Sequence, residues 1–236
     1  MSFISTFDKI WFDISRKSAP VHQNIEWISY HIPKTAGSSL RLSMERAYST
    51  QAIYGVYRQS GAKQLNIGGN IWLPKEAKVI HGHFRSHVNH YKYFPNAKRM
   101  VWVRDPIERA WSFLGHILDV KEKNPQYQLL KSRYLDKGIN DKAKLFECLI
   151  NDNELNHFLF TYQRYFKQVS IEQFDFVGSM HCIKKDFARL SDFLGTNLVI
   201  ENKNKRTESK DLPTAVRRLE NLFSDEYDVV GKYLNK

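Results

Sequence analysis

The chain has 236 residues, 42% of them hydrophobic and 14% aromatic, which suits one α/β domain with a packed core and argues against wholesale disorder. Lysine and arginine number 36 against 25 aspartate and glutamate residues, and the resulting net charge of +11 favours an anionic partner without identifying it. The two cysteines form no C-x-x-C pair and so give no support to a zinc ribbon or a dithiol redox site.

No apolar run reaches the about 18 residues that span a bilayer, and the N-terminus lacks the layout of a signal peptide. We therefore expect a cytoplasmic protein of one domain over residues 1–236, with a lead-in over 1–24 and an α/β core over 25–236.

Apolar periodicity and turn residues predict the elements of the core. The first half is predicted to contain strands over Glu26–His31, Ala77–Gly82 and Arg99–Arg104, helices over Ser38–Tyr48 and Pro106–Val120, and an exposed loop over Lys121–Gln128. The second half is predicted to contain helices over Asp141–Ile150 and Asn153–Phe166, a strand over Phe174–Ser179, a helix over Ile183–Leu194 closed by Gly195, a charged loop over Asn202–Lys210 and a last helix over Pro213–Leu234.

Strands that alternate with helices indicate an α/β fold, here a three-layer domain with a central, mainly parallel sheet flanked by helices. Ligands of such sheets bind at the carboxyl ends of the strands. Three polar motifs follow predicted strands: Lys34–Ser39, His81–Arg85 and Arg104–Ser112. We expect them to converge on one site.

The loop Lys34–Ser39 precedes a predicted helix, so it aims backbone N–H groups, hydroxyl groups and an ammonium group at one point. Helix N-termini favour anions because their first N–H groups lack partners and the helix dipole is positive there. The loop is therefore a candidate phosphate site. It is not the common nucleotide loop, since G-x-x-x-x-G-K-[ST] occurs nowhere in the chain.

The segment that begins at Arg104 offers a second phosphate contact. Arg104 ends a predicted strand and Ser112 lies two turns into the next helix, so a guanidinium group and a hydroxyl group would reach one phosphate. Arg109 is ambiguous, and a pairing with Asp105 or Glu108 is the expected alternative.

His83 follows the second of these motif-bearing strands, and a histidine there suits general-base work because its pKa lies near neutrality. We assign structural roles to His81, His87 and His90. A metal site in this histidine-rich run is disfavoured because the run contains no carboxylate or thiol, and no metal ligand is predicted.

Three segments together, HIPKTAGSSL, HGHF and VRDPIERAWS, resemble the sulfotransferases that use 3′-phosphoadenosine-5′-phosphosulfate (PAPS), closest to the group of heparan sulfate 2-O-sulfotransferase and its bacterial relatives. The resemblance spans most of residues 25–236. It implies a three-layer, P-loop-like α/β fold. It also implies PAPS as the donor, no required metal, and His83 and Lys34 as catalytic residues. It implies that the 5′-phosphosulfate is held by Lys34, Thr35, Ala36, Gly37, Ser38 and Ser39. It implies that the 3′-phosphate is held by Arg104 and Ser112, with Lys205 and Arg206 as contacts from a donor-covering loop.

The resemblance and the basic charge both indicate a hydroxylated acceptor, a polysaccharide, oligosaccharide or glycolipid, while a small metabolite or a protein tyrosine stays open. Many bacterial members read G-H-F-P-Y-G where this chain has Gly82-His-Phe-Arg85-Ser-His87, so Arg85 and His87 are expected to reshape the acceptor side. Tyr91, Tyr93 and Phe94 are candidates for stacking on a sugar, although core positions are favoured for them.

Two other functions are considered. A phosphotransferase would bind ATP or GTP with Mg²⁺, and the missing nucleotide loop argues against it. A polyanion-binding protein without activity would fit the charge, but the basic residues are dispersed and no nucleic-acid-binding motif occurs, so no nucleic-acid partner is predicted.

Overall fold

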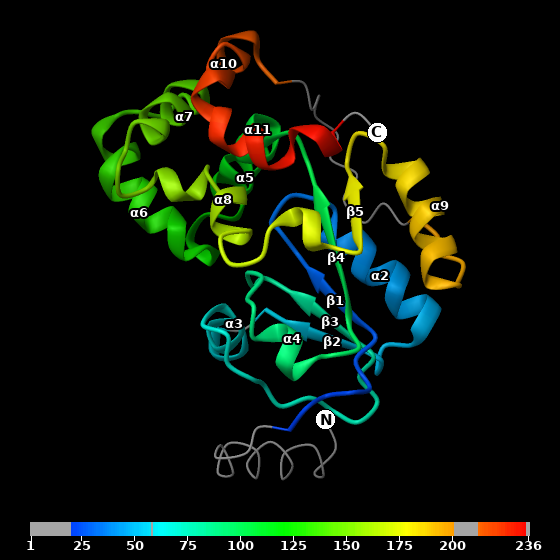
Figure 1. The fold of residues 1–236 in the computed structure, drawn as a ribbon. Coiled ribbons are helices and arrows are strands. Elements are labelled where there is room, and N and C mark those ends of the chain that lie inside the picture. Colours follow the sequence, from blue (N-terminus) through cyan, green and yellow to red (C-terminus); the bar gives the residue numbers. More distant parts are fainter. Residues whose placement is uncertain (1–19, 58, 201–211, 235–236) are drawn as a thin grey trace.

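The computed structural model describes residues 20–57, 59–200 and 212–234 (Figure 1). Most of the predicted lead-in and the charged loop over 202–210, with Lys205 and Arg206, lie outside these residues.

Five strands form one sheet in the order β2-β3-β1-β4-β5, and every neighbouring pair is parallel. The strands are β1 (Trp27–Tyr30), β2 (Ile53–Val56), β3 (Val79–Gly82), β4 (Lys98–Val103) and β5 (Phe176–Ser179). The predicted α/β fold with a mainly parallel sheet is confirmed. Sequence analysis missed only β2, whose four residues lie in a stretch of mixed composition.

Helices cover both faces of the sheet (Figure 1). One face packs against α2 (Gly37–Tyr48) and α9 (Ile183–Leu194). The other packs against α3 (Gln59–Asn66), α4 (His90–Tyr93), α8 (Tyr162–Tyr165) and α11 (Ser224–Val230). Trp27 faces the first layer and Ile28 the second, so adjacent residues of one strand are both buried. Burial on both faces explains why these strands are short apolar runs without alternation.

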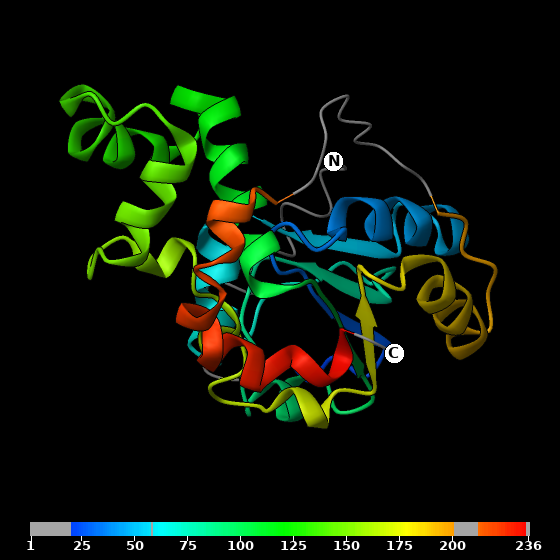
Figure 2. The ribbon, with the colours of Figure 1, turned by 90° about the horizontal axis from the view of Figure 1, so that it is seen from above.

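A third group of helices packs around its own apolar core. It comprises α5 (Pro106–Val120), α6 (Pro125–Arg133), α7 (Lys142–Ile150) and α10 (Thr214–Arg217). Figure 2 shows the green helices of this group at the left, apart from α2 and α9 at the right. Short 3₁₀ turns link the elements: Lys121–Lys123, Leu135–Lys137, Asn156–Phe158, Ile171–Gln173, Glu220–Phe223 and Gly231–Tyr233.

The predicted exposed loop over Lys121–Gln128 is wrong, because α6 begins inside it. The side chain of Asn124 accepts a hydrogen bond from the Gln126 N–H at 2.9 Å, and Pro125 occupies the first helical position. This Asn-Pro pair is a helix start signal that was interpreted as loop composition.

Two predicted helices are wrong in extent. The stretch Asn153–Phe166 contains only a 3₁₀ turn and α8, and Pro213–Leu234 is broken into α10, a 3₁₀ turn, α11 and a last turn. The break has a packing reason, because Val216 is buried in the third helical group while Val230 is buried against the sheet. Because the chain bends between these residues, the amphipathic stretch over residues 213–234 places apolar side chains in both cores.

The remaining helix predictions are confirmed to within one or two residues, and the turn φ of 64° at Gly195 closes α9 as expected. Neither Cys148 nor Cys182 forms a disulfide within the described residues. Among the described residues, no helix is long and apolar enough to cross a bilayer.

Glu226 of α11 anchors the irregular stretch before α8. Its carboxylate accepts hydrogen bonds from the N–H groups of Thr161, Tyr162 and Gln163 at 2.7, 2.8 and 3.0 Å, and the residue is only 1% exposed. These are backbone donors that α8 cannot satisfy within itself. One carboxylate therefore holds α8 and α11 together.

Replacing Glu226 with alanine is expected to lower the free energy of unfolding by about 3 kcal/mol, because it leaves buried N–H groups without an acceptor. Urea denaturation monitored by tryptophan fluorescence measures the change. The neighbouring Asp225→Ala is the control, since Asp225 is exposed and its loss should cost at most about 0.5 kcal/mol. Equal effects of the two substitutions would contradict the anchoring role.

Candidate active site

The parallel sheet brings the three predicted motifs to one edge. Tyr30 at the end of β1 pairs with Gly82 on β3 and with Val101 on β4, so the loops after these strands are neighbours. The chain leaves β1 toward β2 and leaves β4 toward β5, in opposite directions across the sheet. Ligands of α/β sheets bind at such a switch point. The loops that begin at His31 and Arg104 flank it.

The loop after β1 has a constrained backbone. Lys34 and Ala36 have φ values of 74° and 65°, in the left-handed region that residues with a Cβ rarely adopt. The buried Thr35 between them donates its hydroxyl proton to the Ile32 carbonyl at 2.8 Å. This hydrogen bond of the Thr35 hydroxyl group stabilises the loop conformation. Helix α2 begins at Gly37, after this loop.

The remaining predicted loop residues lie in the first turn of α2. Ser38 is exposed and Ser39 is half-buried, so both hydroxyl groups are near the surface at the helix start. A Cβ added to Gly37 would lie 1.9 Å from Cδ2 of His31. Glycine is required there because the His31 ring occupies that space.

His83 is held as a neutral ring with one nitrogen ready to accept a proton. Its Nδ1 lies 2.8 Å from the carbonyl oxygen of His31. A carbonyl oxygen only accepts hydrogen bonds, so Nδ1 carries the proton and Nε2 of the neutral ring keeps its lone pair. Burial lowers the pKa of His83, against a smaller opposing effect of this hydrogen bond. The unprotonated form therefore dominates at neutral pH.

His31 and Tyr57 complete the surroundings of His83, and sequence analysis missed both. The rings of His31 and His83 have centroids 4.3 Å apart, and Tyr57 meets His83 edge-on at 4.8 Å. The Tyr57 hydroxyl lies 3.1 Å from Nδ1 of His31. His31 stands inside the first motif and was within reach of sequence analysis, whereas Tyr57 carries no local signal.

Two of the histidines with predicted structural roles are buried. Nδ1 of His81 bonds Ser29 Oγ at 2.8 Å. His90 bonds the Leu65 carbonyl through Nε2 at 3.0 Å and the Tyr30 hydroxyl through Nδ1 at 3.0 Å. A neutral ring satisfies both of the His90 contacts, since one nitrogen donates and the other accepts. The structural prediction fits both residues.

Arg104 is fixed by its backbone and paired by its side chain. Its N–H and carbonyl oxygen both bond the Tyr162 hydroxyl, at 2.8 and 2.7 Å. Its Nε and Nη2 lie 3.4 Å from Oε2 of Glu108. Glu108 also accepts a hydrogen bond from Arg217 at 3.0 Å. The guanidinium group of Arg104 thus has one edge on a carboxylate.

The start of α5 also binds residues from the C-terminal part of the chain. Asp105 caps α5 by accepting from the Glu108 N–H at 3.0 Å, and its other oxygen accepts from Arg217 at 3.2 Å and from the Tyr227 hydroxyl at 2.8 Å. The side chains of Asp105, Glu108 and His181 each offer a possible metal-ligand atom, and these atoms lie within 4.8 Å of one another. Because both carboxylates already pair with Arg217, their positions are explained by an ion-pair network.

The expected pairing of Arg109 with Asp105 or Glu108 is wrong. Arg109 is 1% exposed and donates to the carbonyl oxygens of Phe158 and Leu159, so it holds the segment before α8. Ser112 lies three residues further along α5 and is half-buried.

The three aromatic residues that were candidates for stacking on a sugar differ in burial. Phe94 lies in the core, and Tyr93 packs against the core. Tyr91 is 40% exposed, and the Arg99 guanidinium group lies on its ring.

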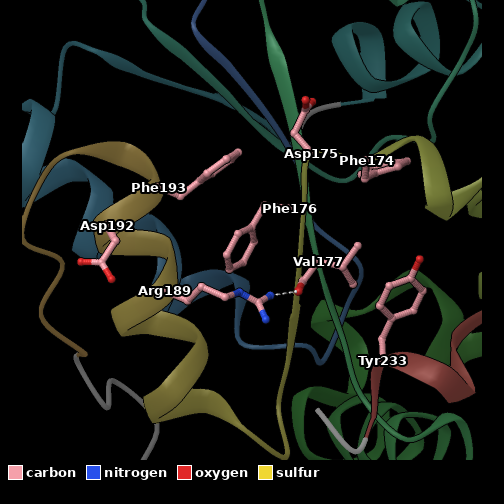
Figure 3. Close-up of a pocket in the computed structure, with 8 residues that line it drawn as sticks. All are labelled: Phe174, Asp175, Phe176, Val177, Arg189, Asp192, Phe193 and Tyr233. Carbon is pink, nitrogen blue, oxygen red and sulfur yellow. Dashed lines mark hydrogen bonds between the residues drawn. The ribbon is translucent and has the colours of Figure 1, made fainter.

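A surface hollow of about 640 Å³ lies elsewhere, beside the amino half of β5 (Figure 3). Figure 3 shows Arg189 of α9 donating to the Val177 carbonyl on its wall, with Phe176 and Phe193 beside it. None of the predicted site residues that the structure describes lines it. It is not part of the candidate active site.

No family model matches the sequence, and no curated protein matches it. Several solved structures match this chain, among them two sulfotransferases. One is the mouse sulfotransferase SULT7A1 complexed with PAP, with a TM-score of 0.52 and 15% identity over 94% of this chain and 91% of that chain. The other is a sulfotransferase from Alicyclobacillus acidocaldarius, with a TM-score of 0.45 and 14% identity over 89% of this chain and 94% of that chain. The chain therefore has the fold of the mouse sulfotransferase.

The buried histidines make stability depend on pH. Burial lowers the pKa of His81 to about 3 and that of His90 to about 4, whereas an unfolded histidine titrates near about 6.5. Between these values the unfolded chain binds protons that the folded chain does not, so the free energy of unfolding falls as the pH drops below about 6.5. We expect a loss of about 2 kcal/mol from each residue by pH 5.

Urea unfolding at pH 7 and pH 5 measures this loss. His90→Gln should remove its own share of the loss, about 2 kcal/mol, while replacement of the exposed His157 should leave the pH dependence unchanged. A wild-type stability that is the same at both pH values would contradict the prediction.

Proposed function

We propose that this protein is a PAPS-dependent sulfotransferase that transfers a sulfuryl group to a hydroxyl group of a carbohydrate acceptor in the cytoplasm. The observation that carries the proposal is the placement of His83. Its neutral ring, with Nδ1 on the His31 carbonyl, directly follows β3. Strand β3 pairs with β1, and β1 leads into the Lys34 loop. The fold shared with the mouse sulfotransferase supports it, since that protein is complexed with PAP.

The donor would bind along the carboxyl edge of the sheet. Lys34 and the N–H groups at the start of α2 would hold the 5′-phosphosulfate, together with the hydroxyl groups of Ser38 and Ser39. Ala36 and Gly37 contribute backbone only. Arg104 and Ser112 would hold the 3′-phosphate, and we assign further donor contacts to Lys205 and Arg206.

Arg104 can serve this role while it is paired with Glu108. The carboxylate lies against its Nε and Nη2, so the Nη1 donors remain for a phosphate oxygen. Glu108 would then orient the guanidinium group, and Arg217 would neutralise the carboxylate beside a bound anion.

In the proposed reaction the acceptor oxygen attacks sulfur while Nε2 of His83 takes the hydroxyl proton. A bond from sulfur to the acceptor oxygen forms, and the bond from sulfur to the 5′-phosphate oxygen breaks. The negative charge moves to that phosphate oxygen, where Lys34 and the N–H groups of the loop would stabilise it. Because this cationic loop supplies the neutralisation, the proposal requires no metal.

Donor binding is tested by calorimetry without magnesium, comparing adenosine 3′,5′-bisphosphate with AMP and ATP. We expect binding that needs the 3′-phosphate and that weakens at least about tenfold in Arg104→Ala, because a charge-assisted contact is lost. The control is Arg133→Ala, a substitution in the third helical group that also removes an arginine from an ion pair. A preference for ATP that requires magnesium would indicate a phosphotransferase instead.

The catalytic base is tested by His83→Ala in a transfer assay with labelled PAPS. Turnover should fall about 10²- to 10⁴-fold, the usual contribution of a general base, while the affinity for adenosine 3′,5′-bisphosphate stays the same. Lys34→Ala should lower both. His157→Ala replaces an exposed histidine and should change neither.

The lowered pKa of His83 also predicts how the activity depends on pH. The base is active when unprotonated, so kcat/KM should fall only below about pH 6.5. Full activity of His83→Ala, or a wild-type acidic limb above neutrality, would refute the assignment.

A further inference from the structure

The loop that follows His83 is tied to α8, from the opposite half of the chain. The Ser86 hydroxyl contacts the carbonyl oxygen of Tyr165, the last residue of α8, at 2.7 Å, and that of Val169, beyond the helix, at 3.2 Å. Ser86 is 3% exposed, so this junction is buried. The residues immediately before each partner, Arg85 and Arg164, are therefore brought to the same part of the surface, next to His83.

Among the described residues, no carboxylate forms an ion pair with either arginine. Within residues 20–57, 59–200 and 212–234, Arg164 makes no hydrogen bond or ion pair, although it borders a surface hollow that Asp225 and Asp228 also line. Arg85 makes no ion pair in the same ranges. Its N–H and its Nε bond only the side-chain oxygen of Asn66, at 2.7 and 3.5 Å. Both guanidinium groups thus keep donors for a ligand.

The two arginines act on each other. Partial burial lowers the pKa of Arg164 most, and the charge of Arg85 is the next cause. The charge of Glu226 opposes this effect and is the last of its causes, and the carboxylate of Glu226 binds three backbone N–H groups rather than Arg164. Two like charges held together without an ion-paired carboxylate repel each other, and an anion that binds between them relieves this repulsion.

We propose that Arg85 and Arg164 form a subsite for an anionic group of the acceptor, a carboxylate or a sulfate ester on a unit next to the hydroxyl group that is sulfated. This inference rests on the proposed function and narrows it to an acidic acceptor. Arg85 is two residues beyond His83, so their Cα atoms are at most about 7 Å apart, which fits an anion on the same or the adjacent sugar unit. Planar guanidinium groups bind carboxylate and sulfate oxygens in pairs.

The test is calorimetric titration of three probes into the full chain, with and without adenosine 3′,5′-bisphosphate. The first probe is a tetrasaccharide of alternating glucuronate and N-acetylglucosamine, the second is its carboxyl-reduced form, and the third is the reduced form carrying one sulfate ester. We expect the wild type to bind the first or the third probe at least about tenfold more tightly than the neutral second one. The probe preferred identifies the anion.

Arg85→Ala and Arg164→Ala should each weaken binding of the preferred probe by about five- to tenfold, and the double variant should bind all three probes equally. Binding of the neutral probe and of adenosine 3′,5′-bisphosphate should not change. Lys184→Ala removes one exposed charge from α9, on the opposite face of the sheet, and should have no effect.

Equal binding of all probes by the wild type, binding of none, or an acidic preference that survives in the double variant would overturn the subsite. Failure of the wild type to bind adenosine 3′,5′-bisphosphate would instead overturn the proposed function, so the two failures are distinguishable.

Discussion

The position of β1 at the centre of a fully parallel sheet is the constraint on which the candidate site depends. Parallel strands end at the same edge, so the loop after β1 lies between the loop after β3 and the loop after β4. The loop after β1 brings the ammonium group and the helix N-terminus, the loop after β3 brings a histidine, and the loop after β4 brings an arginine. Groups far apart in sequence meet because the chain direction is the same in every strand.

The second constraint is the burial of several histidines without carboxylate partners. Burial lowers the pKa of His31, His81, His83 and His90. The neighbouring rings and Lys34 lower that of His31 further. The cost of burying a charge exceeds what a backbone hydrogen bond returns, so these rings stay neutral. Neutrality makes His83 a usable base near neutral pH, and it also makes the fold sensitive to acid.

Carboxylates hold the C-terminal part of the chain against the same edge. Asp105 and Glu108 at the start of α5 accept hydrogen bonds from Arg217. Glu226 accepts hydrogen bonds from backbone N–H groups before α8. The segment over residues 214–230 therefore connects the strand end that carries Arg104 with the junction that carries Arg164. The proposed donor and acceptor sides share one supporting network, which keeps their spacing fixed.

Some features of this protein were determined by local sequence. Short apolar runs, the lysine loop and the Pro106 helix start predicted β1, β3, β4, α2 and α5, because burial on both faces and helix capping leave signals within a few residues. The same local signals made Lys34, His83 and Arg104 site candidates, and the alternation of strands with helices predicted the fold. The Asn124-Pro125 helix start was also present in the sequence but was interpreted as a loop.

Other features were decided only by tertiary structure. The tautomer of His83 depends on the carbonyl of His31, the pairing of Arg104 depends on Glu108 and Arg217, and Arg109 is buried against carbonyls 49 and 50 residues away. Arg85 and Arg164 are 79 residues apart in sequence and meet through Ser86 and Tyr165, themselves 79 apart. The sequence determined which groups follow which strands, because local patterns encode strands and helix starts. The partners, and with them the protonation state and charge of each group, were decided by long-range packing, which leaves no pattern in the neighbouring residues.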